Sequence, residues 1–206
     1  MDEKNFYERY WQGSGRAAGF FEETPEWPEG LLKKKLEWIR SFLSGNWLDA
    51  GCGSGEFVNA LSKHVRAFGI DISRTAVEKA KKKFPSVRFK QGSVTEIPFA
   101  KNFFDGIVAF EIIEHVLDTD AMFSEFNRVL KKGGFLCITT PQFTKLKAVL
   151  IAVSCLDKYF EPESPHIRYY TLGNLKKELS MHGFELMLYK PDGSFSPGFP
   201  KGMFVV

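Results

Sequence analysis

The sequence predicts an α/β fold: a doubly wound, mostly parallel sheet of seven strands with an antiparallel last strand. Three observations support this prediction. Short apolar segments alternate with segments of helical period along most of the chain. One apolar segment leads directly into the glycine-rich stretch from Gly51 to Gly55, which is typical of a strand-to-helix turn. An acidic residue, Asp71, closes the next apolar segment.

The first half of the chain is expected to alternate helices with strands. Apolar residues repeat at helical spacing from Gly30 to Ser44, and Gly45 supplies a stop. A second helix follows the glycine-rich stretch, and a third begins behind an N-cap at Ser73. Strands are predicted at residues 47–50, 67–70, 87–90 and 106–110.

The second half continues the same alternation. A helix is expected after a cap at Asp118 or Thr119, and a strand at residues 135–139 follows the turn at Gly133 and Gly134. Alternation in this order predicts right-handed crossovers, with helices on both faces of the sheet. Two further helices are predicted at residues 145–156 and, behind Thr171, at 172–181; two late strands at 184–189 and 203–206 are expected to pair antiparallel at the sheet edge.

Length and composition favour one globular domain over residues 1–206. A chain of 206 residues is too short for two ordinary domains and a linker. The hydrophobic share of 44% and the charged share of 26% exclude the disordered and fibrous classes. The 21 phenylalanines indicate an aromatic-rich core or an apolar substrate cavity, and composition leaves both open.

The distribution of charges and cysteines limits which partners and cofactors we expect. The 28 basic and 25 acidic side chains are interspersed, so no basic tract forms and no nucleic acid is expected. No apolar run approaches the roughly 20 residues of a membrane span, so we expect a cytoplasmic protein without one. Cys52, Cys137 and Cys155 lack the spacing of a metal or redox site and are expected to be buried thiols.

The glycine-rich stretch and Asp71 together predict a nucleotide-like ligand. Glycines directly after a strand let the backbone pass close to a ligand and aim the N–H groups of the next helix at it. Asp71 lies where a carboxylate can accept hydrogen bonds from both ribose hydroxyls. The simpler alternative is a tight turn with Asp71 as a helix cap. A nicotinamide enzyme is disfavoured, because Glu56 stands where its fingerprint has a third glycine.

Several segments resemble motifs of the class I S-adenosylmethionine-dependent methyltransferases, which share a Rossmann-like fold. Residues 48–55, Leu-Asp-Ala-Gly-Cys-Gly-Ser-Gly, are similar to the first motif of that family. Residues 69–73 resemble its second-strand motif, 91–99 its adenine-side loop and 130–135 its fifth-strand entry. The pattern is most similar to the ubiquinone-biosynthesis-like small-molecule methyltransferases.

The resemblance implies an enzyme that transfers the methyl group of S-adenosylmethionine to a small molecule and releases S-adenosylhomocysteine. Gly51 and Gly53 would lie against the methionine part, with Asp49 bracing the loop. Asp71 would hold the ribose. Many relatives have Asp where Ser93 stands, so the contact to the adenine amino group passes to a hydroxyl or to backbone. The cofactor-binding residues implied are Asp49, Gly51, Gly53, Asp71, Ile72, Ser93, Val94 and Phe110.

The resemblance also divides the chain into three parts. The aromatic-rich residues 1–28 correspond to an N-terminal lid segment. Residues 29–142 form the cofactor-binding core, and residues 143–206 supply substrate-side helices and the final strands.

The segment after Phe110 is expected to face the methyl acceptor, because ligands bind beyond the carboxyl ends of the strands in a doubly wound sheet. If Glu111 opens a helix, Glu114 and His115 fall at i+3 and i+4 and share one face with it. An oxygen acceptor must lose a proton. His115, His166 and Glu111 are the candidate catalytic residues for that step.

The same residues form a candidate divalent-cation site. Glu111, Glu114 and His115, with His166 as a fourth ligand, offer carboxylate oxygens and imidazole nitrogens that suit magnesium, manganese or zinc. The pattern resembles metal-dependent quinone O-methyltransferases and small-RNA 2′-O-methyltransferases. In the alternative, the two glutamates cap a helix N-terminus, while His115 packs locally or acts as a general base.

Other functional classes stay open at this point. A protein that binds S-adenosylmethionine or S-adenosylhomocysteine without catalysis can share the fold, since fold does not fix function. A metal-dependent O-methyltransferase acting on a larger substrate such as RNA is a further alternative. The aromatic-rich composition favours a compact, partly apolar methyl acceptor. The methyl group is expected to pass to an oxygen or nitrogen of this acceptor by in-line displacement.

Overall fold

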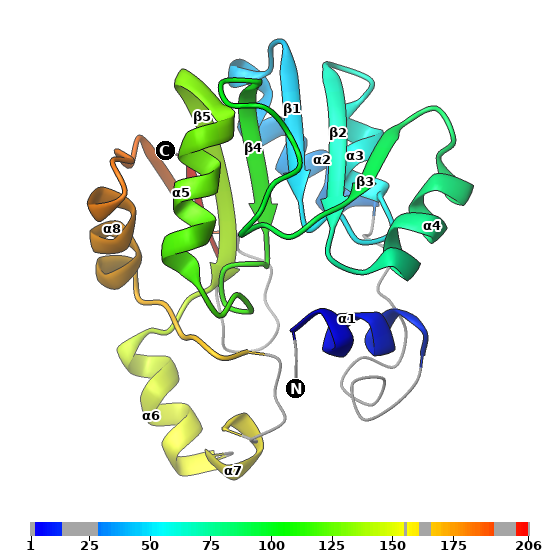
Figure 1. The fold of residues 1–206 in the computed structure, drawn as a ribbon. Helices are drawn as coiled ribbons and strands as arrows, with labels where there is room; N and C mark the ends of the chain where they lie inside the picture. Colours follow the sequence, from blue (N-terminus) through cyan, green and yellow to red (C-terminus); the bar gives the residue numbers. More distant parts are fainter. Residues whose placement is uncertain (1–2, 14–28, 155, 161–165, 192–200, 206) are drawn as a thin grey trace.

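The computed structural model describes residues 3–13, 29–154, 156–160, 166–191 and 201–205. Its centre is a seven-stranded sheet in the order β3-β2-β1-β4-β5-β7-β6 (Figure 1). The first five strands run parallel to their neighbours, whereas β7 is antiparallel to both β5 and β6. The strands are β1 (Asn46–Ala50), β2 (Arg66–Asp71), β3 (Arg88–Gln91), β4 (Phe104–Phe110), β5 (Leu130–Pro141), β6 (Leu188–Pro191) and β7 (Lys201–Val205). The prediction of an α/β, Rossmann-like fold with a parallel sheet is confirmed.

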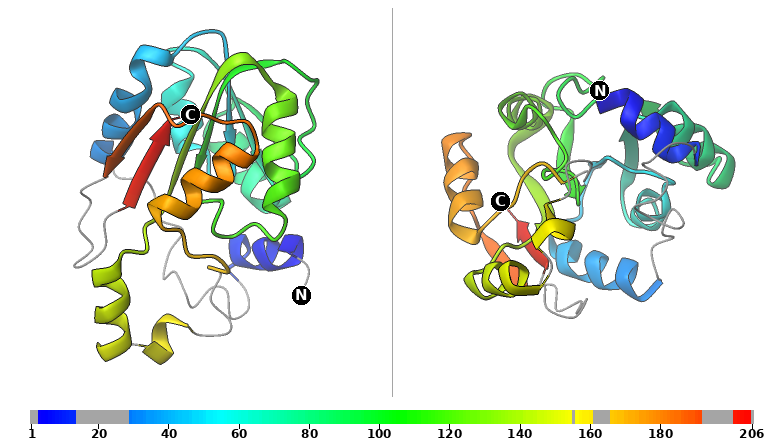
Figure 2. Two further views of the ribbon diagram at one scale, coloured as in Figure 1. Left: turned by 90° about the vertical axis from the view of Figure 1, so that its left-hand side faces the viewer. Right: turned by 90° about the horizontal axis from the view of Figure 1, so that it is seen from below.

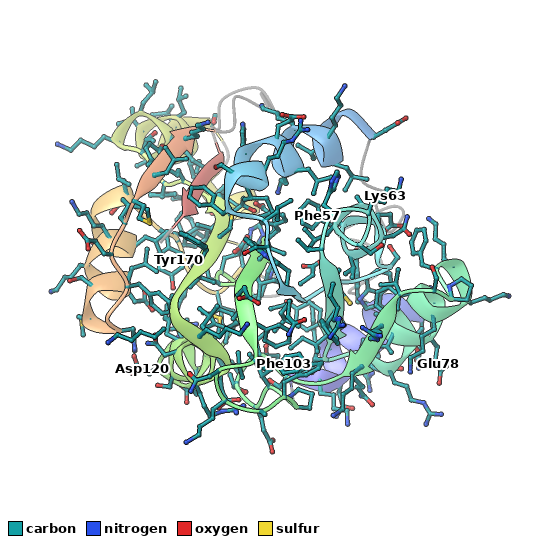
Figure 3. All side chains as sticks on the ribbon, turned by 90° about the horizontal axis from the view of Figure 1, so that it is seen from above. Phe57, Lys63, Glu78, Phe103, Asp120 and Tyr170 are labelled. Atoms are coloured by element: carbon teal, nitrogen blue, oxygen red, sulfur yellow. The ribbon has the colours of Figure 1, made fainter. Side chains whose placement is uncertain are left out.

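Helices cover both faces of the sheet, as two separate apolar clusters show. One cluster joins the sheet to α5 and α8, and the other joins it to α2, α3 and α4. Figure 3 labels Phe57 of the second cluster, and Phe103 and Tyr170 of the first. The helices are α1 (Glu3–Trp11), α2 (Glu29–Ile39), α3 (Glu56–Leu61), α4 (Arg74–Lys83), α5 (Thr119–Val129), α6 (Lys145–Ser154), α7 (Leu156–Tyr159) and α8 (Leu172–Met181), with a short 3-10 turn at Arg40–Phe42.

Side-chain caps fix where three of these helices begin. The Ser73 hydroxyl accepts a hydrogen bond from the Ala76 N–H at 3.1 Å and so starts α4. Asp118 starts α5 and Thr171 starts α8 in the same way. Each cap satisfies an N–H that the first helical turn leaves without a partner. All three predicted cap positions are therefore confirmed, with Asp118 rather than Thr119 before α5.

Some predicted boundaries were wrong. The strand predicted at residues 135–139 begins earlier, because β5 already pairs with β4 through Leu130 and Phe104 before a register shift. The strand predicted at 184–189 is found at Leu188–Pro191. The single helix predicted at 145–156 is present as α6 and α7, with residue 155 outside the described part.

The phenylalanines serve mainly to pack the core. Phe68, Phe99, Phe103 and Phe104 form a set of edge-on and stacked contacts with ring centroids between 4.9 and 5.7 Å. Cys52 and Cys137 are buried free thiols, and burial raises the pKa of the Cys137 thiol to about 12. Cys155 lies outside the described residues. No helix among the described residues is long and apolar enough to cross a membrane.

The sheet order has its topological switch point between β1 and β4, where a ligand crevice is expected. Chain connections leave these neighbouring strands in opposite directions, toward β2 on one side and β5 on the other. Ligands bind at such a switch point, beyond the carboxyl ends of the strands. Helices α1, α6 and α7 lie beyond the carboxyl ends of these strands (Figures 1 and 2).

Candidate functional site

The glycine loop after β1 holds a backbone shape that side chains oppose. Gly51 and Gly53 have φ values of +80° and +50°, in the left-handed region. A Cβ at Gly51 would lie 2.1 Å from the Ile112 side chain, and one at Gly53 would lie 3.0 Å from the Trp11 ring. Any larger residue at Gly51 or Gly53 would therefore clash with the loop after β4 or with α1.

Asp71 joins the end of β2 to the glycine loop. Its two carboxylate oxygens accept hydrogen bonds from the backbone N–H groups of Gly53, at 3.0 Å, and Ser73, at 2.9 Å. Burial raises the pKa of Asp71 to about 6, although both hydrogen bonds oppose the shift. The acid predicted to hold the ribose thus lies beside the glycine loop. Its contact with a ribose stays a prediction.

Asp49 and Lys35 are both buried, and sequence patterns had pointed only to Asp49. Burial, followed by the Asp71 charge, raises the pKa of Asp49 to about 8, and the Lys35 charge opposes this shift. Lys35 is only 2% exposed. Its ammonium donates to the Thr139 hydroxyl at 3.2 Å and lies 4.2 Å from the centre of the Phe110 ring.

The position of Lys35 could have been found from helical spacing. Three consecutive lysines suggest a solvated surface, but only one of them is buried. That lysine stands between Leu32 and Ile39 at intervals of three and four residues, so it falls on the apolar face of α2.

The loop predicted to receive adenine lies beside β3. Ile72 is half-buried, and its carbonyl accepts a hydrogen bond from the Gln91 side chain at 3.0 Å. The Ser93 hydroxyl is within 2.7 Å of the Thr95 hydroxyl and accepts from the Thr95 N–H at 3.1 Å. Val94 is half-buried against the core. These contacts fix the loop, and its predicted role toward adenine stays a prediction.

The helix predicted to open at Glu111 was wrong. Glu111 has a φ of +56°, and its N–H donates to the Thr139 carbonyl at 2.8 Å, which continues the sheet. The Glu114 carbonyl, which a helix would use internally, accepts instead from the N–H groups of Ile167 and Arg168, at 3.0 and 3.2 Å. The left-handed φ of Glu111 and the tertiary partners of the Glu114 carbonyl are therefore both incompatible with a helix that begins at Glu111. The alternative of two glutamates capping a helix is wrong for the same reason.

Three of the four predicted acceptor-side residues nevertheless meet. Ligand atoms of Glu114, His115 and His166 all lie within 4.8 Å of one another, a group that does not include Glu111. Glu114 is 1% exposed and accepts from the Thr140 hydroxyl at 3.0 Å. One of its oxygens lies 4.0 Å from the His115 Nε2, and the two imidazole ring centroids are 4.8 Å apart.

The segment after His166 is held against two strand ends. Besides the bonds to the Glu114 carbonyl, the Arg168 guanidinium donates to the carbonyls of Val116 and Leu117. Tyr170 accepts from the Phe143 N–H at 2.7 Å through its carbonyl. This network holds His166 at the end of β4, although His166 lies far from that strand in the sequence.

Helix α1 covers both halves of the site. The Tyr7 ring meets the His115 ring edge-on at 6.0 Å, while Trp11 is buried against Gly53. Burial, with the nearby Glu3 and Glu114 charges, raises the pKa of Tyr7 above its usual range, so the phenol keeps its proton. The sequence indicated an aromatic segment here without a sustained period. The structure describes a helix for residues 3–11, and residues 14–28 of the predicted lid lie outside the described part.

Glu8 fastens α1 to the start of α4. Its carboxylate accepts hydrogen bonds from the hydroxyls of Ser73, at 2.8 Å, and Thr75, at 2.5 Å. These contacts lower the pKa of Glu8, the Thr75 hydroxyl being the main cause. No sequence pattern pointed to Glu8, because its partners lie more than sixty residues away.

Comparisons with known proteins agree with this geometry. Residues 48–138 match the family model of a methyltransferase domain. The demethylmenaquinone methyltransferase of Staphylococcus aureus is 34% identical over 132 residues, which cover 60% of this chain and 53% of that protein. The phosphoethanolamine N-methyltransferase 1 of Triticum aestivum is 33% identical over 139 residues, covering 65% of this chain and 26% of that protein.

A solved structure extends the likeness over the whole fold. The geranyl diphosphate C-methyltransferase of Streptomyces coelicolor, in complex with Mg²⁺, geranyl diphosphate and S-adenosyl-L-homocysteine, superposes with a TM-score of 0.70. Sequence identity is 16%, and the superposition covers 100% of this chain and 98% of that one. At this identity the likeness concerns the fold alone.

The family match, the glycine loop and the sheet order point to the same class of protein. Over residues 48–138 the chain is similar to a methyltransferase domain, and its sheet order agrees with the Rossmann-like fold of the class I S-adenosylmethionine-dependent methyltransferases. It spans about a quarter to a half of the length of the two curated relatives, 26% and 53%. The comparisons do not single out the ubiquinone-biosynthesis-like group to which the motifs were most similar.

Proposed function

We propose that this chain is a methyltransferase that moves the methyl group of S-adenosylmethionine to an oxygen or nitrogen of a small molecule. The observation that carries the proposal is that the loops after β1 and β4, on either side of the predicted crevice, lie against each other at Gly51 and Ile112. The glycine loop and Asp71 lie on one side, and Glu114, His115 and His166 lie on the other. Such a crevice can hold a methyl donor in line with an acceptor.

On the cofactor side, the glycine loop lets the backbone approach a ligand closely, and larger residues at Gly51 and Gly53 would clash with Ile112 and Trp11. Asp71 would exchange part of its backbone hydrogen bonding for the ribose hydroxyls. The buried Asp49 and Phe110 would line the methionine end, with Lys35 beneath the Phe110 ring. The reactive group belongs to the cofactor, so the protein's work is positioning and exclusion of water.

On the acceptor side, the two imidazoles are the groups that can take a proton. The acceptor attacks the sulfonium methyl carbon, the carbon–sulfur bond breaks, and S-adenosylhomocysteine leaves with the electron pair. A proton released by an oxygen acceptor passes to His115 or His166, while the Glu114 carboxylate orients His115. Glu111 is not part of this cluster, so we assign it no role in proton transfer.

A small acceptor is supported by relatives with different chemistry. The names of two of them specify demethylmenaquinone and phosphoethanolamine, and a structure of similar fold holds geranyl diphosphate. We also propose a division of the chain by function. Residues 29–142 hold the cofactor, residues 143–206 bound the acceptor, and the segment 1–28 closes over both through α1.

The test combines cofactor binding with methyl transfer. Calorimetry should show S-adenosylhomocysteine binding, and a radiolabelled methyl group should reach members of a panel of phenols, amines and prenyl compounds. Binding without transfer to any acceptor would favour a non-catalytic binding protein. Binding of NADH without S-adenosylhomocysteine binding would overturn the proposal.

A second candidate, metal-assisted transfer, rests on the donor set of the Glu114, His115 and His166 cluster. One carboxylate and two imidazoles suit zinc or manganese and leave positions open for a substrate oxygen. A bound cation would lower the pKa of that oxygen and orient it. This candidate predicts binding of Zn²⁺ or Mn²⁺ by calorimetry, lost in His166→Ala and kept in His182→Ala, whose ring faces Asp120 instead. Equal binding by both variants would exclude the cluster as the cation site.

A further inference from the structure

Helices α6 and α7 expose an unusual number of apolar side chains. Leu146, Val149, Leu150 and Val153 are between 40% and 77% exposed and follow one another at helical spacing along one face of α6. The face continues into α7, where further apolar side chains are about half exposed: Leu156 at 49% and, just after the helix, Phe160 at 48%. We call these six side chains the α6–α7 apolar face.

Helix α6 is apolar on both of its faces. Its inner face buries Ile151, together with Lys147, which lies 5.9 and 5.2 Å from the ring centres of Phe143 and Tyr159. Its outer face carries leucine and valine, whereas a helix that faces water normally carries polar side chains there. The apolar outer face indicates that it meets an apolar phase in the working protein.

Charge favours an anionic lipid surface as that phase. Helix α6 contains no acidic residue, and its exposed Lys145 stands next to Leu146, while its second lysine, Lys147, is buried. Helix α7 adds one acidic residue, Asp157, and one lysine, Lys158. The whole chain carries a formal charge of +3. Apolar side chains bordered by lysine are typical of helices that lie in the membrane interface, where apolar burial and attraction to anionic headgroups add.

Size disfavours a second copy of the chain as the occupant. A helix of ten residues, such as α6, is about 15 Å long and about 10–12 Å wide. A stable protein–protein interface buries roughly 800 Å² on each partner, which a short helix and a single following turn do not provide.

We propose that the α6–α7 apolar face docks the protein on an anionic membrane surface. Both helices lie beyond the carboxyl edge of the sheet, on the same side as α1 and the cluster of Glu114, His115 and His166 (Figures 1 and 2). Docking through this face brings the acceptor side of the crevice toward the lipid. The surface lies outside the catalytic residues, so docking can be removed without removing cofactor binding.

The test is vesicle flotation with the full chain. We expect it to float with vesicles of phosphatidylcholine and phosphatidylglycerol, and to float less with pure phosphatidylcholine. A triple variant, Leu146→Ser with Val149→Ser and Val153→Ser, should lower the bound fraction by about tenfold or more, since each buried apolar side chain contributes to partitioning. Calorimetry with S-adenosylhomocysteine checks that this variant still folds and binds its cofactor.

The chain offers a matched control on another surface. Met181 and Met187 are 71% and 62% exposed but lie at the end of α8 and just before β6. Met181→Ser with Met187→Ser removes apolar area of similar size and should leave flotation unchanged. Equal flotation of the triple variant and the wild type would overturn the proposal. A wild type that stays with the soluble fraction, and forms a dimer that the triple variant abolishes, would replace the membrane with a second copy.

Discussion

The two sides of the crevice between β1 and β4 are built in different ways. On the cofactor side, the part from Asp49 to Asp71 comes from one continuous stretch, in which β1, the glycine loop, α3 and β2 follow one another. The acceptor side is assembled from three distant parts of the chain: Tyr7 on α1, Glu114 and His115 after β4, and His166 before α8.

This difference has consequences for what each side can tolerate. On the cofactor side, close packing and left-handed backbone fix the shape, since a Cβ at Gly51 would meet Ile112. On the acceptor side, shape depends on hydrogen bonds between loops, such as those from Ile167 and Arg168 to the Glu114 carbonyl. Substitutions on the two sides should therefore separate affinity for the cofactor from the rate of methyl transfer.

The largest expected effect is on turnover by the His115→Ala variant. Loss of a general base lowers rates by about 10²–10⁴-fold, so transfer to an oxygen acceptor should fall within that range. The Kd for S-adenosylhomocysteine should stay the same, because His115 lies on the acceptor side. The pH profile of kcat gives a second readout, since the rise controlled by the base should disappear. A tenfold or larger loss of cofactor affinity would break the separation.

The next effect concerns affinity through Asp71→Asn. Hydrogen bonds to a charged group contribute about 1.5–3 kcal/mol, so the variant should bind S-adenosylhomocysteine about ten- to a hundredfold more weakly. Asp105→Asn is the matched control. Asp105 also accepts a backbone hydrogen bond, from the Asn46 N–H at 2.8 Å, but lies at the start of β4, at the opposite edge of the sheet. Equal losses in both variants would mean that only stability had changed.

A smaller effect is predicted on stability as a function of pH. The pKa of Asp49 is raised to about 8 in the folded state, against about 3.9 in the unfolded chain. The folded state therefore holds this proton more tightly, and its stabilising contribution is lost as the pH rises from about 4 through about 8. Between pH 5 and pH 8 the free energy of unfolding of the wild type should fall at least about 1 kcal/mol further than that of Asp49→Asn. Parallel curves from urea unfolding would show that Lys35 keeps Asp49 ionised.

The same comparison explains what the sequence could predict. The glycine loop, Asp71 and the caps at Ser73 and Thr171 depend on neighbours within a few residues, so local patterns revealed them. The helix considered at Glu111 is absent because Glu111 has a left-handed φ and the Glu114 carbonyl finds partners on another segment. Such partners are not visible in a local pattern.

Buried polar groups were missed for a related reason. Lys35 resembles its exposed neighbours in sequence, and only the packing of α2 on the sheet shows that it reaches Thr139 and Phe110. Helix α1 contains apolar residues, but of these the structure buries only Trp11, and its position depends on contacts with α4. The proposal that α1 covers the site rests on those contacts.

The smallest expected effect tests whether α1 is a lid. Glu8→Gln removes the charge that accepts from the hydroxyls of Ser73 and Thr75, and loss of such a bond contributes about 1–2 kcal/mol at most. If α1 opens for cofactor exchange, S-adenosylhomocysteine should dissociate a few-fold faster in stopped flow while the acceptor chemistry stays unchanged.

The pKa of Glu8 is lowered, so the contact is complete above the ordinary glutamate pKa and is lost as the pH falls toward its lowered value. Release by the wild type should therefore quicken toward low pH and approach that of the variant. Glu78→Gln, on the exposed side of α4 and paired with Arg74, is the control and should leave the release rate unchanged. Unchanged release in Glu8→Gln would show that α1 is a fixed part of the wall.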